Sequence, residues 1–578
     1  MRKNVLVRLG RFLRPYGFQF LLLLALLLAG NLLSLAAPLL SGRAVDAVGI
    51  RAGGVDFSGV LWNCAGMLGC YALSSLLSYV VSSRLIRTAQ AVSHDLRKAA
   101  FDRMSELPVD YFDTHPAGDL ISRVCYDVDT VNATLSTDLL QLGTSVFTVA
   151  GSFLMLLLLS PRLTLVFFVT VPLSVFLIRF QMKRIHPLFR LRSKELGALN
   201  GFAEERMGCR RSIRAYGVEE ADLELFELRN AAASKAYYDA DRASASLGPS
   251  VNFVNNISLT FVSVFGALLY LGGGLSLGSL SSFVLYSRKF SGPIREAANL
   301  LAELQASAAA AERVLDLLDE EPESAGPAGA LPVERLRGDI RFDHVTFGYD
   351  PARPVLRDFT AHIPAGSLAA VVGPTGAGKT TLVSLLLRFY RPQSGSIAVD
   401  GVPLENWDRD GLRRRLALVL QDTWLFGGTI AENIAYGAPE ASREEIVEAA
   451  KAARIHRFIT SLPQGYDTIL TDEGVSKGQK QLLAIARCLL ADADVVILDE
   501  ATSNVDTETE GEISLAMERL RQGRTCFVIA HRLATVRGAD RILVLDQGRA
   551  AEIGTHRELL AAGGVYAQLY AAQFQSRI

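Results

Sequence analysis

Long stretches of apolar residues without a single charge mark the first half of the chain. Most are close to the roughly 20 residues that an α-helix needs to cross the hydrocarbon core of a bilayer. The last stretch is about twice that length, and the glycines at 272–274 divide it. The sequence therefore predicts six membrane-spanning helices, at 17–40, 57–83, 139–160, 163–178, 243–271 and 275–287.

Basic residues are unevenly distributed between the two sides of these helices. Lys and Arg precede the first helix and are frequent in 84–136 and 179–242, whereas the connections 41–56, 161–162 and 272–274 are short and poor in them. Because such residues accumulate on the cytoplasmic side, both termini are predicted to lie in the cytoplasm. The apolar spacing of the two long basic segments is largely helical, so they are predicted to extend the spans into the cytosol.

The sixth predicted span is unusually short. Only about 13 uncharged residues separate the glycine turn from Arg288 and Lys289, and they cover about 20 Å of a roughly 30 Å core. One interpretation is that the two cations snorkel to the cytoplasmic headgroups. The other is that at least one faces a water-filled cavity and contacts an anionic or amphipathic cargo.

The composition argues against some classes of partner and site but does not identify a function. Acidic and basic residues nearly cancel, giving a formal net charge of −1, so nothing indicates a nucleic-acid partner. The six cysteines lack CxxC or CxxxC spacing, which disfavours a zinc site or a disulfide framework. Residues 319–337 are acidic and rich in Pro, Gly and Ala, as is typical of a linker. We therefore expect a transmembrane domain over 1–318 and a soluble domain over 338–578.

The soluble half contains a phosphate-binding pattern. An apolar strand pattern, "SLAAVV", precedes "GPTGAGKTT", and an apolar helix pattern follows it. Glycines let backbone N–H groups approach phosphates, while Lys379 would reach the β- and γ-phosphates and the Thr380 hydroxyl would ligate Mg²⁺. The predicted phosphate loop consists of Gly373, Pro374, Thr375, Gly376, Ala377, Gly378, Lys379, Thr380 and Thr381.

Two further segments add chemistry to this loop. "DVVILDE" is a buried strand pattern that ends in Asp499 and Glu500, at the strand end where α/β sheets place their ligands. Asp499 is expected to hold magnesium through water, and Glu500 to polarise the attacking water. Ser476 and Gly478 stand at the start of a predicted helix, where a hydroxyl and free N–H groups form an anion site. One chain thus carries two phosphate-binding patterns.

These motifs resemble those of the ATP-binding cassette family, whose "LSGGQ" signature stands here as "VSKGQ" at 475–479. The resemblance implies a dimer in which one subunit's signature, including Ser476, Gly478 and Gln479, closes on ATP held by the other subunit's loop. It also implies that Tyr349 stacks on adenine, that Gln421 senses Mg²⁺ and faces the membrane domain, and that 501–506 links the two ATP sites. His531 matches the histidine that contacts the γ-phosphate.

The membrane half resembles the exporter-type members of that family. Residues 110–129 and 204–220 are similar to their two cytoplasmic loops, whose short transverse helices press on the nucleotide-binding domains. The resemblance covers essentially the whole chain. It implies an all-α six-helix transmembrane domain followed by an α/β nucleotide-binding domain with a P-loop.

One departure from the family pattern concerns the signature. Only Val475 stands between Gly474 and Ser476, where the family usually has about two more residues. A shortened turn would displace Ser476 from the neighbour's γ-phosphate, although Glu500 and His531 are retained. This combination resembles one subunit of the heterodimeric exporters, and a homodimer remains the alternative.

The function expected from the sequence is ATP-driven export by a half-transporter in a bacterial-type plasma (inner) membrane. Its cargo is expected to be a hydrophobic or amphipathic small molecule such as a drug or a lipid, with ATP and Mg²⁺ as cofactors. One alternative keeps the fold but takes up a metal chelate. Another is a non-transporting membrane protein, such as a regulator or a channel that uses ATP only to gate.

Overall fold

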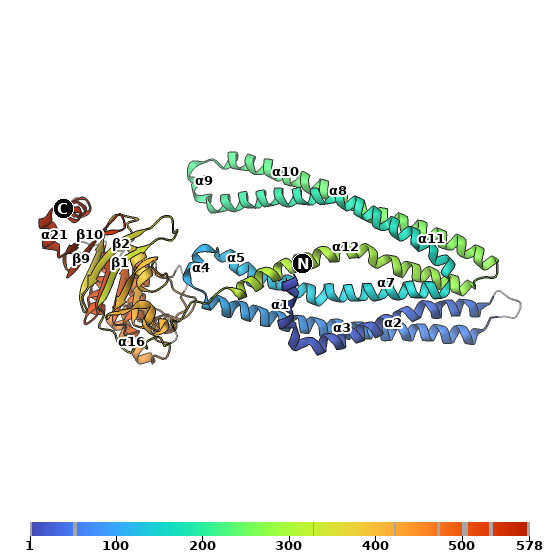
Figure 1. Cartoon of the computed structure of the whole chain (residues 1–578), viewed down its shortest axis with the longest axis horizontal. Helices are drawn as coiled ribbons and strands as arrows, with labels where there is room; N and C mark the ends of the chain where they lie inside the picture. The colour runs from blue at the N-terminus through green and yellow to red at the C-terminus, as the bar shows by residue number, and fades with distance from the viewer. Residues whose placement is uncertain are drawn as a thin grey trace. The chain divides into compact units, whose positions relative to one another are not determined.

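The computed structural model describes residues 3–49, 55–327, 329–420, 423–470, 474–499, 507–530 and 536–574. They form two compact units, each with its own core (Figure 1). The helical unit comprises Met1–Ser105 and Ala117–Glu320, and the α/β unit comprises Glu106–Pro116 and Glu321–Ile578. A short segment between two membrane helices thus belongs to the α/β unit.

Long helices make up most of the helical unit. They are α2 (Gly17–Val48), α3 (Phe57–Glu106), α7 (Leu139–Leu159), α8 (Pro161–Gly208), α10 (Glu219–Ala245), α11 (Leu247–Leu271) and α12 (Leu277–Asp319). The shorter elements are α1 (Lys3–Leu13), η1 (Arg14–Tyr16), α5 (Ala117–Ser122), α6 (Val128–Ala133) and α9 (Arg210–Tyr216), with two π-helical turns, η2 (Arg123–Asp127) and η3 (Thr134–Asp138). Their arrangement confirms the predicted all-α membrane half.

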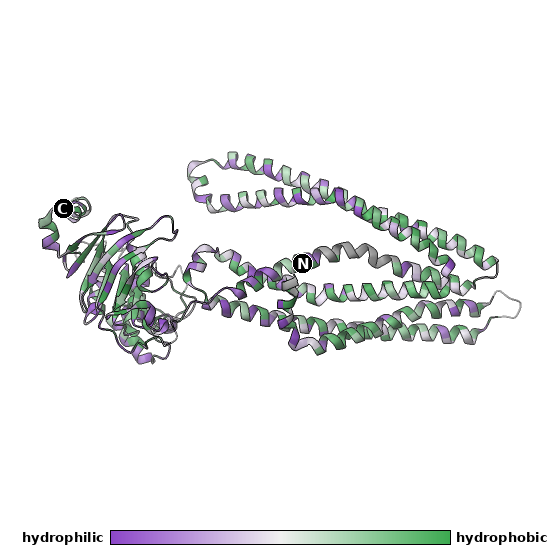
Figure 2. Ribbon diagram, in the orientation of Figure 1, coloured by the Kyte–Doolittle hydropathy of each residue, from purple (hydrophilic) through white to green (hydrophobic). Residues whose placement is uncertain are grey.

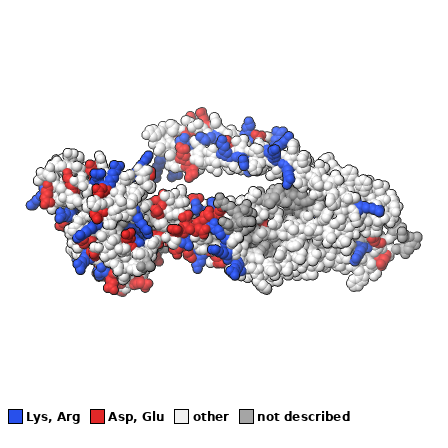
Figure 3. Space-filling view, viewed as in Figure 1, with Lys and Arg blue, Asp and Glu red and all other residues white. Residues whose placement is uncertain are grey.

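Hydropathy along these helices is consistent with a bilayer. Among the described residues, five helical segments are long and apolar enough to cross it: Val7–Val48, Phe57–Glu106, Ala117–Leu159, Pro161–Gly208 and Glu219–Leu271. The predicted sixth span begins α12, where Arg288 and Lys289 interrupt the apolar run. Hydrophobic residues dominate α2, α7 and α11, and hydrophilic ones gather around α9 and α10 (Figure 2). Charges are dense at the end of the helical unit that carries α9 and sparse at the opposite end (Figure 3).

The membrane helices pack through an aromatic core with a few polar links. Phe167, Phe283 and Phe290 pack together with ring centroids 5.3 to 6.3 Å apart. Asn31, the polar residue within the first predicted span, accepts a hydrogen bond from Thr148 at 2.9 Å. Its side chain also donates to the Leu27 carbonyl of its own helix at 3.1 Å. A polar group that would be costly in lipid is thereby satisfied between α2 and α7.

Two sheets form the centre of the α/β unit. The six-stranded sheet has the order β10-β9-β3-β8-β7-β6, and the four-stranded sheet has the order β2-β1-β4-β5. The strands are β1 (Ile340–Phe347), β2 (Leu356–Ile363), β3 (Leu368–Val372), β4 (Ser394–Val399), β5 (Val402–Pro403), β6 (Leu416–Val419), β7 (Val495–Asp499), β8 (Thr525–Ile529), β9 (Arg541–Asp546) and β10 (Arg549–Gly554). Strands β9, β3, β8, β7 and β6 pair in parallel, as in α/β folds.

Alternate residues of the parallel strands belong to two different hydrophobic cores. In β8, Cys526 and Val528 belong to one core, and Phe527 and Ile529 to the other. Because strand side chains alternate between the faces of a sheet, both faces of the six-stranded sheet are covered. The helices of this unit are α4 (Val109–Thr114), α13 (Lys379–Leu386), η4 (Leu404–Asn406), α14 (Arg409–Arg414), α15 (Ile430–Ala435), α16 (Arg443–Ala452), α17 (His456–Ser461), η5 (Gly465–Asp467), α18 (Lys477–Leu490), α19 (Thr507–Arg521), α21 (His556–Ala562) and α22 (Val565–Phe574).

Candidate functional site

Strand register brings the predicted catalytic segments to one edge of the six-stranded sheet. Ile529 at the end of β8 pairs with Val371 of β3 on one side and with Asp499 of β7 on the other. Because these strands are parallel, their carboxyl ends reach the same level of the sheet. The phosphate loop follows β3 directly, so it begins at the same edge at which Asp499 ends β7. This is the edge where open α/β sheets bind ligands.

The loop itself has the backbone that its glycines predict. Gly376 and Gly378 have positive φ values of +82° and +103°, a conformation that costs other residues energy. A Cβ atom on Gly373 would lie only 2.3 Å from the Leu545 carbonyl oxygen. Pro374, Thr375 and Gly376 are exposed, whereas Ala377 and Gly378, immediately before α13, are buried. The loop is therefore open at its apex and anchored at its base.

The Lys379 side chain folds back onto this loop. Its ammonium donates to the carbonyl oxygens of Gly373 at 2.8 Å and Pro374 at 3.0 Å. Burial lowers the pKa of Lys379, and the Asp499 carboxylate opposes that shift. The side chain is thus pre-placed as a half-buried cation beside exposed loop residues, where an incoming phosphate would satisfy it better than neutral carbonyls do.

Thr380 and Asp499 are the described members of the predicted magnesium site. The Thr380 side chain is exposed in the first turn of α13, and Asp499 lies at the end of β7. A hydroxyl and a carboxylate are the hard oxygen donors that suit Mg²⁺, which commonly completes its octahedron with water and substrate phosphates. Within the described ranges, no cluster of three or more His, Cys, Asp and Glu residues could hold a metal by itself. These residues fit a metal that arrives with a nucleotide.

Tyr349 lies close to the phosphate loop. Its ring is exposed, and its hydroxyl is 3.4 Å from the Thr381 hydroxyl at the buried side of α13. Phe347 and Tyr390 flank it edge-on, with ring centroids 5.3 and 5.1 Å away. An exposed ring held by two other aromatics can stack on a flat base such as adenine.

The signature residues form the start of α18. Ser476 caps this helix: its hydroxyl accepts from the Gln479 N–H at 3.3 Å, and the Gln479 side chain accepts from the Ser476 N–H at 2.9 Å. Gly478 is buried in the first turn of α18. The Ser476 hydroxyl proton is not used by the cap, so this group can still donate to an anion.

Three predicted residues, Gln421, Glu500 and His531, lie outside the described residues, as does the predicted linking loop 501–506. The strands that precede Gln421 and Glu500, β6 and β7, pair in parallel with Val419 opposite Leu498. Their roles stay predictions from the sequence.

The two cations of the sixth span have different surroundings. Arg288 is exposed. Lys289 instead points into the helical unit, where its ammonium donates to both the carbonyl and the hydroxyl oxygen of Ser34 at 2.7 Å. It also lies 6.0 Å from the centroid of the Tyr71 ring. Lys289 therefore contacts α2 and α3 rather than extending along its own helix.

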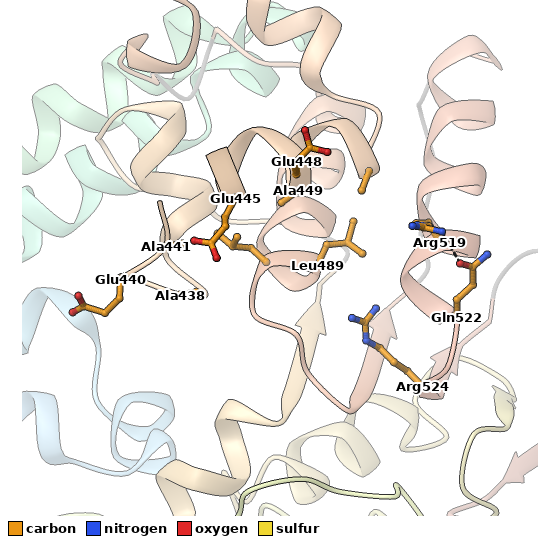
Figure 4. A pocket seen from close by; sticks show the side chains of 12 residues that line it. Ala438, Glu440, Ala441, Glu445, Glu448, Ala449, Leu489, Arg519, Gln522 and Arg524 are labelled. Carbon is orange, nitrogen blue, oxygen red and sulfur yellow. Dashed lines mark hydrogen bonds between the residues drawn. The ribbon is translucent and has the colours of Figure 1, made fainter. Parts of the chain in front are cut away.

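A separate cleft of about 730 Å³ lies between α16, α18 and α19 (Figure 4). Glu445 and Glu448 lie on one wall, and Arg519 and Arg524 lie on the other. Two of these charged side chains already have partners within the protein: Glu445 accepts a hydrogen bond from the Ser442 N–H, and Arg524 pairs with Asp492. In the described structure, the lining includes none of the predicted nucleotide-binding residues.

Sequence reasoning missed the contacts that anchor the linker. Glu323 is mostly buried and pairs with Arg409 at 3.2 Å and with Arg413 at 2.5 Å. Its N–H donates to the Glu106 carbonyl at 2.7 Å, which ties the linker to the end of α3. In the sequence, Glu323 is one acidic residue among several in a Pro-rich and Gly-rich segment, so nothing near it indicated these contacts.

Comparisons with known proteins agree with this geometry. Residues 20–294 match the family model of the ABC transporter transmembrane region, and 356–503 match that of the ABC transporter. A "Fatty acid ABC transporter ATP-binding/permease protein" of Mycobacterium bovis is 43% identical over 535 residues, which are 92% of this chain and 84% of that protein. An "ATP-dependent lipid A-core flippase" of Alkalilimnicola ehrlichii is 35% identical over 576 residues, 98% of this chain and 96% of that protein.

A solved structure is also similar over nearly the full length. It is described as "Structure of a bacterial Atm1-family ABC exporter with ATP bound", and it matches with a TM-score of 0.80 and 29% sequence identity. The match covers 97% of this chain and 98% of the other.

Proposed function

Because the chain belongs to the ATP-binding cassette transporters, as an exporter-type half-transporter whose ATPase is coupled to transport, we propose that it exports hydrophobic or amphipathic small molecules of lipid-like character. The observation that carries the proposal is the phosphate loop at the carboxyl edge of a parallel sheet, in one chain with membrane-spanning helices. Lipid-like cargo is supported by the fatty-acid and lipid A-core relatives, whose cargoes are named for them and not for this chain.

We propose that ATP lies between this chain's phosphate loop and the signature of a second subunit. Tyr349 stacks on adenine, and Lys379 leaves the Gly373 and Pro374 carbonyls to bind phosphate oxygens. Glu500 orients the attacking water, and His531 contacts the γ-phosphate. Magnesium, held by Thr380, Gln421 and Asp499 when bound, supplies neutralisation of phosphate charge.

The nature of the second subunit follows from the signature. With only Val475 before Ser476, two copies of this chain would bring two shortened signatures together, so we propose a heterodimer with an unaltered partner. Purified alone, the chain should then hydrolyse ATP slowly. Brisk ATPase from the isolated chain, lost on Glu500→Gln, would show instead that a homodimer is sufficient.

We propose that the protein lies in the plasma (inner) membrane with both termini in the cytoplasm. The uneven distribution of Lys and Arg supports this orientation, since such residues remain on the cytoplasmic side. The same proposal divides the chain into a transmembrane domain at 1–318, a linker at 319–337 and a nucleotide-binding domain at 338–578.

Transport is tested with liposomes in which the nucleotide-binding domains face outward. Added Mg²⁺ and ATP should drive a fluorescent lipid from the outer to the inner leaflet, and the protein with Lys379→Ala should not. ATP-driven loss of a preloaded metal chelate from the lumen would support uptake, the reverse direction. A steady ion current in place of cargo movement would favour an ATP-gated channel. Either result would overturn the export proposal.

A further inference from the structure

A proline interrupts the hydrogen bonding of α2 within the membrane. Pro38 lies inside this helix and has no N–H, so the carbonyl of Ser34, four residues earlier, has no donor from its own helix. Such a carbonyl is expensive to leave unpaired where water is absent. The position therefore needs a donor from elsewhere in the protein.

Helix α12 supplies donors at this position. The Lys289 ammonium donates to the Ser34 carbonyl at 2.7 Å, and the Tyr286 hydroxyl donates to the next carbonyl, that of Leu35. Ser282 donates to the carbonyl of Pro38 itself at 2.8 Å. The spacing of these donors, three and four residues, places them on one face of α12.

The same face approaches α2 closely towards the start of α12. A Cβ atom on Gly42 would lie 2.0 Å from the Ser282 hydroxyl and 2.4 Å from the Gly278 carbonyl, so the two helices meet backbone to backbone. Asp46 then accepts from the Gly278 N–H and from the Ser276 hydroxyl, both at 2.7 Å. We call this row of contacts, from Lys289 to Ser276, the α2–α12 seam.

We propose that Lys289 is a positioning residue that locks α12 onto α2 at the break made by Pro38, and that it is not a cargo ligand. Resting on the proposed function, this leaves Arg288 as the cation of the pair that is still accessible to a cargo or to lipid headgroups. Lys289 has hydrogen-bond acceptors in both oxygens of Ser34 and a cation–π contact with Tyr71, so its ammonium is already engaged within the protein. Arg288 is exposed on the same turn.

Thermal unfolding of the full chain in lipid nanodiscs, without ATP or cargo, tests this assignment. Lys289→Met should lower Tm by about 2 °C or more, because the Ser34 carbonyl loses its donor. The same substitution combined with Pro38→Ala should cost little beyond Pro38→Ala alone, because residue 38 then donates within α2. Arg288→Met is the matched control and should leave Tm unchanged. An unchanged or raised Tm for Lys289→Met would overturn the proposal.

A second comparison does not require Pro38→Ala to fold. Lys289→Gln keeps an N–H donor without the charge, so it should be more stable than Lys289→Met and should keep the wild-type half-saturating concentration of a fluorescent anionic lipid in ATPase stimulation. If Gln and Met variants are equally stable and both raise that concentration, Lys289 binds cargo and the assignment is wrong. Because Tm requires neither transport nor ATP, failure of the export proposal would leave this stability result intact.

Discussion

The hydroxyl of Tyr390 donates a hydrogen bond to the carboxylate of Asp113, across 277 positions of sequence and within the α/β unit. Burial and the Asp113 carboxylate raise the pKa of Tyr390, so the hydroxyl stays protonated and can donate at neutral pH. The Tyr390 ring also meets Tyr349 edge-on at 5.1 Å. The candidate adenine-stacking residue is thus connected through one aromatic ring to α4, the short helix that follows the membrane helix α3.

Tyr390→Phe is expected to uncouple ATP hydrolysis from transport. The variant keeps the ring that supports Tyr349, so its ATPase should stay near that of the wild type. It loses the bond to α4, which is worth about 1 kcal/mol, and the cargo moved per ATP should fall by about fivefold. Parallel assays of phosphate release and lipid transfer in proteoliposomes measure this ratio.

The double variant Tyr390→Phe with Asp113→Asn is the control for this bond. If the two groups act through one hydrogen bond, the double variant should be no worse than the more impaired single variant. Additive losses would show that Asp113 and Tyr390 act separately. Tyr238→Phe, at an exposed tyrosine of α10, should change nothing.

The membrane helices and the phosphate loop were predictable because their signals are local. Absence of charge over a span, or glycines between a strand and a helix, can be read from neighbouring residues. The partners of Lys289 and Tyr390 were not predictable, since they lie 255 and 277 positions away. The sequence placed Lys289 at membrane depth, but the donor requirement created by Pro38 becomes visible only when α2 and α12 lie side by side.

Glu323→Gln should loosen the linker from the α/β unit. The Glu323 carboxylate is 17% exposed and pairs with two arginines, so its neutralisation leaves Arg409 and Arg413 without their shared partner. A loss of about 3 kcal/mol is expected for breaking such a pair. Limited trypsin digestion of the full chain should then cut near Arg335 and Arg337 faster than in the wild type.

Glu321→Gln is the matched control for the linker, because this neighbouring acid is exposed. It should leave the digestion rate unchanged. Equal sensitivity of the two variants would mean that the general acidity of the linker, rather than the Glu323 contacts, protects it.

Lys379→Ala should abolish ATPase and transport together. The substitution removes the half-buried cation above the phosphate loop, while the glycine backbone of the loop remains. We expect ATPase to fall by at least about a hundredfold, comparable to removing one preorganised donor from a developing charge. Lys451→Ala on α16, where the lysine pairs with the exposed Glu448, should retain both activities. Transport that persists in the Lys379→Ala protein would refute ATP-driven export by this chain.

Two capping boxes allow the phosphate role of Ser476 to be separated from its structural role. Ser476 caps α18 with Gln479, and Ser442 caps α16 with Glu445 by the same pair of hydrogen bonds. Replacing either serine by alanine should cost about 1 kcal/mol of stability. Only the Ser476 hydroxyl is predicted to face a nucleotide, across the dimer interface.

Ser476→Asp is therefore the decisive variant. Aspartate caps helices as well as serine does. The assembled dimer with Ser476→Asp should therefore have a Tm close to that of the wild type, whereas Ser476→Ala lowers it. ATPase of the heterodimer should stay close to that of the wild type in both Ser476 variants, because the shortened turn displaces Ser476 from the neighbour's γ-phosphate and hydrolysis relies on the partner's unaltered signature. Ser442→Ala should lose stability and keep ATPase. If Ser476→Asp restores Tm but lowers turnover, its carboxylate is repelling a γ-phosphate; the serine then takes part in hydrolysis, and the heterodimer proposal loses its premise.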